Sequence, residues 1–178
     1  SERGCQSAEI AALIDVLEPV TSCIYLPDAV FNHISPTDTP AGILAVIKLP
    51  TEMTGKTVTS SCVVLEGIQD AGNLGTILRT AAAAGIETVF LSEGCAQAWS
   101  PRVLRAAMGA HFLLSIYEKV NIAELLASYQ GVSMATGLDG ARNLYEINLR
   151  QPIAWLFGSE GQGLSVNTMA LAQQKVMI

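Results

Sequence analysis

The chain has 178 residues, of which 50% are hydrophobic and 15% charged, so it is long enough for one domain, or one domain and a fragment, with a substantial core. Its net charge of −6 at pH 7 disfavours nucleic-acid binding by the surface as a whole, so any such binding would need a local basic patch. No apolar run approaches the roughly 18 residues that a membrane helix needs, so we expect no membrane partner.

The first 50 residues predict a small leading piece. Apolar runs indicate helices at 8–20 and 28–35 and strands at 22–27 and 42–50. This piece is too small to form a stable hydrophobic core of its own, and it begins without an initiator methionine. We therefore expect its native start to be missing. The polar, Gly/Thr-rich stretch 51–60 has no strong period and predicts a linker, which makes 61–178 a second domain.

From residue 62 onward, strand-like and helix-like runs alternate. The predicted strands are 62–67, 87–92, 111–118, 131–136, 152–158 and 175–178, and the predicted helices are 73–85, 100–110, 121–130 and 165–174. This alternation predicts an α/β fold with a parallel sheet and helices on both faces. Ligands bind such sheets at the carboxyl ends of the strands, so the turns to watch are 67–73, 92–100, 136–144 and 158–164.

Cysteine and histidine are sparse and give no metal-binding pattern. The four cysteines are Cys5, Cys23, Cys62 and Cys95, with no C-x-x-C pair among them. We expect reduced, mostly structural thiols in a cytoplasmic protein and no metal site. His33 and His111 each lie alone in the sequence, as packed or surface histidines do more often than ligands.

Two glycine-bearing turns, "DAGNLG" at 70–75 and "GSEGQG" at 158–163, each follow a predicted strand and precede a predicted helix. A P-loop needs G-x-x-x-x-G-K-[ST], which the chain lacks. A dinucleotide fingerprint needs G-x-G-x-x-G, whereas the second turn reads G-x-x-G-x-G. The spacing therefore disfavours a nucleotide-binding oxidoreductase.

Together the two turns resemble the first two signature motifs of the SpoU (TrmH-type) RNA 2′-O-ribose methyltransferases, within the SPOUT superfamily. The first motif, N-x-G-x-x-x-R, is present as Asn73, Gly75 and Arg79; the second, F-G-x-E-G-x-G, is present as Phe157, Gly158, Glu160, Gly161 and Gly163. The stretch "WSPRVLRAAMGAHF" (99–112) also resembles the family. The resemblance covers about residues 60–178.

The resemblance implies methyl transfer from S-adenosylmethionine to a ribose 2′-hydroxyl of RNA, by a homodimer with a deep trefoil knot. The sequence departs from the family at three places. Only the first residue of the third motif is present, as Ile178, so we expect the C-terminal part of the knot to be missing. Ala107 replaces a frequent serine and Ala71 a common proline, and neither change removes an expected catalytic group.

The leading piece has a resemblance of its own. "FNHISPTDTPAGILAVI" (31–47) is similar to the end of the ribosomal-protein-like RNA-binding domain that often precedes the SpoU domain. Residues 1–50 would then be a remnant of that domain, which favours rRNA over tRNA as the substrate. A tRNA ribose methyltransferase and a non-catalytic RNA-binding or assembly protein on the same fold remain the alternatives.

The family resemblance assigns the catalytic roles. Arg79 is expected to hold an RNA phosphate and to relay the proton of the ribose hydroxyl through it, and the alternative is a solvated helix charge. Asn73 would order the active-site loop or touch substrate, or else cap the helix. Glu160 would hydrogen-bond to the loop or the substrate; the alternative is a carboxylate that interacts favourably with the dipole of a helix. Arg102 and Arg105 could face RNA phosphates or form an ordinary solvated basic face.

The methyl donor is expected at the second turn. Gly158 and Gly161 would leave room for the adenosyl group beside main-chain groups. Thr136 and Ile178 occupy positions that contact the donor in relatives of the family. For Ile178, the alternative is an ordinary core residue of a strand.

Overall fold

The computed structural model describes residues 1–49, 58–137 and 142–177, and the chain forms two compact units, residues 1–49 and 50–178. None of the helices among the described residues combines the length and the apolar character that crossing a membrane requires.

The first unit contains only helices and irregular segments among its described residues. The helices are α1 (Glu2–Cys5), α2 (Ala8–Leu17) and α3 (Asp28–Ile34), and the last two confirm the predicted helices. The two strands predicted here are wrong, because 22–27 and 42–49 form no strand; residue 50 lies outside the described residues. A strand is stable only when paired, and neither run has a partner strand among the described residues. Their side chains stay exposed, Ile24 to 80% and Val46 to 93%.

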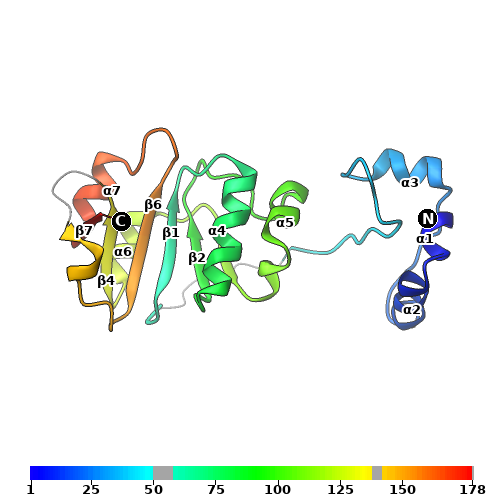
Figure 1. The fold of residues 1–178 in the computed structure, drawn as a ribbon, viewed down its shortest axis with the longest axis horizontal. Coiled ribbons are helices and arrows are strands. Elements are labelled where there is room, and N and C mark those ends of the chain that lie inside the picture. Colours follow the sequence, from blue (N-terminus) through cyan, green and yellow to red (C-terminus); the bar gives the residue numbers. More distant parts are fainter. Residues whose placement is uncertain (50–57, 138–141, 178) are drawn as a thin grey trace. The chain divides into compact units, whose positions relative to one another are not determined.

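The second unit is built on a parallel sheet. Its strands are β1 (Cys62–Glu66), β2 (Thr88–Leu91), β3 (Ser115–Tyr117), β4 (Val132–Thr136), β5 (Arg142–Asn143), β6 (Ile153–Gly158) and β7 (Gln174–Met177). Their order is β3-β2-β1-β6-β4-β7-β5, and each neighbouring pair is parallel (Figure 1). The predicted parallel α/β sheet is confirmed.

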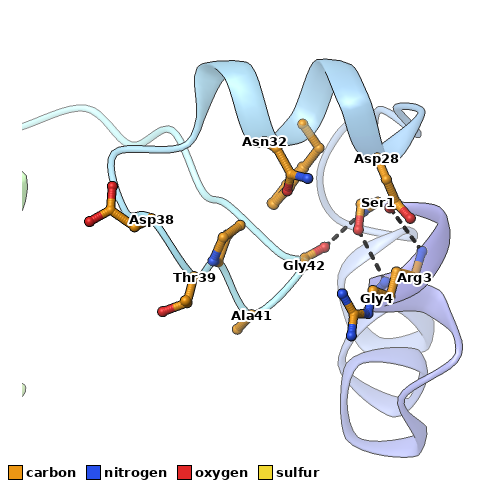
Figure 2. Close-up of a pocket in the computed structure, with 11 residues that line it drawn as sticks. Ser1, Arg3, Gly4, Asp28, Asn32, Asp38, Thr39, Ala41 and Gly42 are labelled. Atoms are coloured by element: carbon orange, nitrogen blue, oxygen red, sulfur yellow. Dashed lines mark hydrogen bonds between the residues drawn. The ribbon is translucent and has the colours of Figure 1, made fainter.

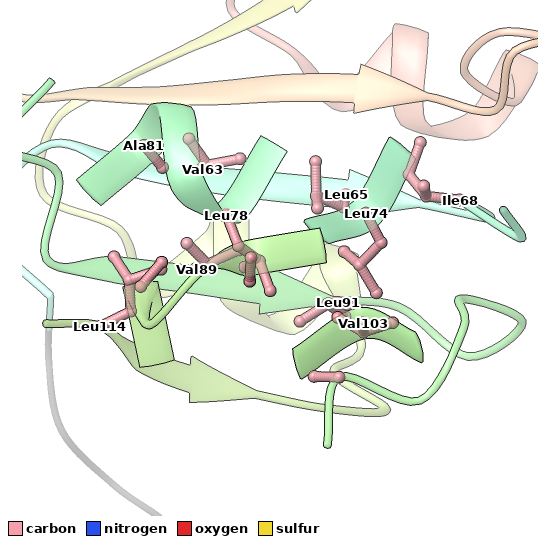
Figure 3. Packing of buried hydrophobic residues seen from close by; sticks show 13 residues of the cluster. Val63, Leu65, Ile68, Leu74, Leu78, Ala81, Val89, Leu91, Val103 and Leu114 are labelled. Atoms are coloured by element: carbon pink, nitrogen blue, oxygen red, sulfur yellow. The ribbon is translucent and has the colours of Figure 1, made fainter. Parts of the chain in front are cut away.

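Helices cover both faces of this sheet, as predicted. They are α4 (Ala71–Ala83), α5 (Pro101–Ala107), α6 (Ile122–Ser128) and α7 (Val166–Leu171), with 3-10 turns η1 (Ala110–Phe112) and η2 (Leu144–Glu146). Alternate residues of β1 point to opposite faces. Val63 and Leu65 pack with residues of α4 and α5 (Figure 3), whereas Cys62 and Val64 pack with residues of α6 and α7.

Two element boundaries differ from the prediction for local reasons. The helix predicted from residue 73 begins at Ala71, because the Asp70 carboxylate caps it by accepting a 2.7 Å hydrogen bond from the main-chain N–H of Asn73. The strand predicted over 111–118 begins only at Ser115. Met108 and Gly109 adopt left-handed φ values of 49° and 87°, which end α5 and lead into η1.

Candidate active site

The two motif turns meet at one edge of the sheet. Strands β1 and β6 are parallel neighbours, and their last residues, Glu66 and Gly158, are paired in register. The turn after β1 leads into α4 and the turn after β6 leads into α7, so both turns lie at the carboxyl edge of the sheet. This is where an α/β sheet binds ligands.

Asn73 and Glu160 connect the two turns directly. The Nδ2 atom of Asn73 donates a 2.7 Å hydrogen bond to Oε1 of Glu160, across 87 residues of sequence. Asp70 takes the capping position of α4, so the alternative interpretation of Asn73 as the helix cap is wrong. The Asn73 side chain is therefore available to hold the Glu160 carboxylate.

The turn that carries Glu160 is closed by its own backbone. Ser159 and Gly163 exchange two hydrogen bonds, with N···O distances of 3.2 and 2.8 Å, and Gly163 adopts a left-handed φ of 68°. A Cβ atom on Gly158 would overlap the main chain of Gly163, so the turn itself needs that glycine. Around Gly161, by contrast, a Cβ atom would meet no other atom within 4 Å. Open space therefore borders the turn at Gly161.

Thr136 ends β4 at the same edge of the sheet, on the far side of β6. Its hydroxyl donates a 3.1 Å hydrogen bond to the carbonyl oxygen of Leu156. It is paired in register with Val176 of β7. Ile178, the other residue predicted to contact the donor, lies outside the described residues.

Arg79 lies on the exposed face of α4, after Asn73 and Gly75. Gly75 lies where α4 meets α5, and a Cβ atom there would overlap the Cβ of Ala106. The middle residue of the N-x-G-x-x-x-R motif thus serves helix packing. The Arg79 side chain is exposed to solvent, so its N–H donors can bind an external anion.

Arg102 and Arg105 are exposed on α5, and among the described residues no hydrogen bond joins them to the Asn73–Glu160 pair. The stretch 94–117 around them contains no Asp or Glu. The acidic chain thus carries a segment whose formal charges are all positive, as a local phosphate-binding patch requires.

Sequence reasoning missed a second set of polar contacts at this edge. Glu66, half-buried at the end of β1, accepts hydrogen bonds from the N–H of Ser165 (2.8 Å), its hydroxyl (2.8 Å) and the hydroxyl of Thr168 (2.7 Å). The only signal in the sequence was an acid directly after the apolar run "CVVL". Its partners lie 99 and 102 residues further on, and no local pattern indicates such a pairing.

A buried thiol and a surface pocket lie away from the two motif turns. Burial raises the pKa of the Cys62 thiol to about 12, so this thiol stays neutral inside the sheet. Within the described parts of the chain, no three His, Cys, Asp or Glu residues gather as metal ligands would. A pocket in the first unit is lined by residues such as Asp28, Asn32 and Thr39, and by none of the predicted site residues (Figure 2).

A parallel sheet with two motif turns joined at adjacent strand ends defines the chain as an α/β protein of the SPOUT type. The chain belongs to the SpoU rRNA Methylase family, whose model matches residues 60–178. The assignment made from the two motifs is therefore confirmed.

Individual relatives extend this comparison. The chain is 43% identical over 118 residues to an uncharacterized tRNA/rRNA methyltransferase of Synechocystis, a match that covers 65% of this chain and 43% of the relative. It is 36% identical over 153 residues to the 23S rRNA (guanosine(2553)-2′-O)-methyltransferase RlmP of Bacillus subtilis, covering 83% and 60%. The chain thus spans about half the length of these relatives.

A solved structure shares the fold. The AdoMet-bound rRNA methyltransferase of Sinorhizobium meliloti superposes with a TM-score of 0.77 at 27% identity, covering 96% of this chain and 67% of that one.

Proposed function

We propose that the protein transfers a methyl group from S-adenosylmethionine to a ribose 2′-hydroxyl of RNA, with rRNA as the substrate. The observation that carries the proposal is the Asn73–Glu160 hydrogen bond, which joins the two family motifs at the ligand-binding edge of the sheet. Family membership and the rRNA methyltransferase names of the relatives support it.

The second turn fits the methyl donor. S-adenosylmethionine, when bound, supplies an electrophilic methyl group on a sulfonium. The open space at Gly161 and the exposed main chain of the Ser159–Gly163 turn would admit an adenosyl group beside backbone N–H and C=O groups. Gly158 contributes by letting the turn close, and Thr136 and Ile178 would complete the site from the neighbouring strands.

Arg79 would act on the RNA. A ribose hydroxyl is a poor nucleophile and must be oriented and relieved of its proton. The Arg79 guanidinium would bind the phosphate next to the ribose through two parallel N–H···O hydrogen bonds, and an oxygen of that phosphate would accept the hydroxyl proton. Asn73 would hold Glu160 so that its carboxylate orders the loop around the reacting ribose.

Arg102 and Arg105 would bind further RNA phosphates. The acid-free stretch 94–117 supports this role, because no like-charged carboxylate there repels the RNA backbone.

Further parts of the proposal have other grounds. A homodimer and the trefoil knot rest on family membership. A cytoplasmic location rests on the scattered cysteines. The division into a remnant RNA-binding domain (1–50), a linker (51–60) and the methyltransferase domain (61–178) rests on the sequence pattern and the resemblance of 31–47.

Methyl transfer tests the proposal directly. The full-length protein is incubated with methyl-labelled S-adenosylmethionine and either rRNA or tRNA, and primer extension at low nucleotide concentration maps the modified position. Wild type should label rRNA. Arg79→Ala should abolish labelling while calorimetry still detects donor binding, because Arg79 contacts the RNA and not the donor. A wild-type protein that binds the donor but labels neither RNA would refute the enzyme and favour a non-catalytic RNA-binding protein.

A further inference from the structure

We propose that Glu66 is a positioning residue that fixes the turn carrying Glu160 against α4. The proposal rests on the proposed methyl transfer for its functional meaning, and on the contacts of Glu66 for its geometry. Glu66 ends the strand that leads to Asn73, and its carboxylate reaches the far end of the turn that carries Glu160. A single side chain therefore joins the segments before and after the site.

The turn that carries Glu160 is held by hydrogen bonds at both of its ends. At its start, β6 is held against β1 by the parallel pairing that ends at Glu66 and Gly158. At its end, Ser165 is held by Glu66 through its main-chain N–H and its hydroxyl. Between these anchors, Ser159 and Gly163 close the turn with reciprocal hydrogen bonds. Glu160 has little freedom to move away from Asn73 while the anchors hold.

Burial strengthens the second anchor. Thr168, which also donates to Glu66, is only 4% exposed, and Ser165 caps α7 by accepting from the Thr168 main-chain N–H at 3.2 Å. Water therefore competes weakly for the Thr168 contact. If Glu66 is lost, these donors lose an acceptor in a place where the solvent cannot fully replace it.

The contacts use both carboxylate oxygens. Oε1 of Glu66 accepts from both hydroxyls and Oε2 accepts from the main-chain N–H, so both oxygens are engaged as acceptors. Glutamine could keep these contacts, with its amide oxygen on the main-chain N–H and its NH₂ donating to hydroxyls that can also accept. Alanine removes every acceptor and would release this end of the turn.

The first test combines kinetics with a direct view of the Asn73–Glu160 bond. Glu66→Ala should lower kcat by about 100-fold, the scale expected when a catalytic group is misplaced by an ångström, while KM for RNA changes less. The Asn73 side-chain amide signals in an ¹⁵N NMR spectrum should move toward those of Glu160→Ala, in which the bond cannot form. Glu124→Ala is the matched control, because Glu124 also accepts a hydrogen bond at a helix N-terminus, on α6, away from both turns.

The second test separates positioning from stability. Thr168→Val keeps the buried volume and removes the hydroxyl, whereas Thr168→Ser keeps the hydroxyl and removes a methyl group. If Glu66 positions the turn, kcat and the Asn73 signals should follow the hydroxyl, so Thr168→Ser rescues what Thr168→Val loses. If both variants lose activity in proportion to their melting temperatures, the contacts only stabilise α7 and the proposal is overturned.

The readouts also separate this proposal from the proposed function. Asn73 signals that stay unchanged in Glu66→Ala overturn the positioning role, whatever the activity. A wild-type protein without methyl transfer refutes the function, while the NMR comparison still decides whether Glu66 holds the turn.

Discussion

Replacing Gly158 with alanine tests whether the second turn depends on close backbone packing. The new Cβ would overlap the carbonyl group of Gly163 and the main-chain nitrogen of Leu164, which are backbone atoms that no rotamer change can move aside. Forcing extra atoms into such a contact costs about 1–3 kcal/mol. For a chain of this size, that corresponds to a fall in melting temperature of roughly 2–12 °C.

Tryptophan fluorescence reports the unfolding of the second structural unit, because both tryptophans, Trp99 and Trp155, lie in residues 50–178. Gly161→Ala is the matched control. It adds the same methyl group to the same turn, but where nothing lies within 4 Å and φ is not left-handed. It should unfold at nearly the wild-type temperature and instead weaken binding of S-adenosylmethionine. Equal melting temperatures for Gly158→Ala and wild type would refute the packing argument.

Two further outcomes follow from the charges and the burial. Burial raises the pKa of Cys62 from 9.0 to about 12, so the neutral thiol stabilises the fold below about pH 9, and that stability is lost as the pH rises toward 12. In denaturant titrations, this group should lower the free energy of unfolding by at most about 1.4 kcal/mol per pH unit over that range. The free energy of unfolding should depend less on pH in Cys62→Ala. If Arg102 and Arg105 contact phosphates, changing both to Gln should weaken RNA binding and reduce the salt-dependence slope by about 2, measured by fluorescence anisotropy at several salt concentrations. An unchanged slope would show that they form only a solvated basic face.

The sequence predicted the central strands well because they are largely buried and read as apolar runs such as "CVVLE" and "IAWLFG". It did not predict β5, whose two residues are polar and exposed. It predicted the two motif turns because their glycines and polar residues are local features. The strands expected at 22–27 and 42–50 failed because apolar side chains alone do not make a strand, which also needs a hydrogen-bonded neighbour.

The polar contacts of the site were harder to predict. Asp70 and Asn73 are both good helix caps, and the sequence does not indicate which of them begins the helix. The structure resolves this by giving the cap to Asp70, which leaves Asn73 for Glu160. Glu66 has no local pattern at all, since its importance arises from a helix about 100 residues away.

The position of β6 in the sheet sets the order in which the site can assemble. This strand lies between β1 and β4, although it follows both of them in the chain. During synthesis, β1 and α4 can form early with Asn73 and Arg79 already in place, but β6 must then be inserted between strands made before it. Such long-range pairing is slow. A nascent chain that has not yet incorporated Glu160 already carries Arg79 and Asn73 on α4, but Asn73 lacks its carboxylate partner. We therefore expect the site to be among the last parts of this unit to form.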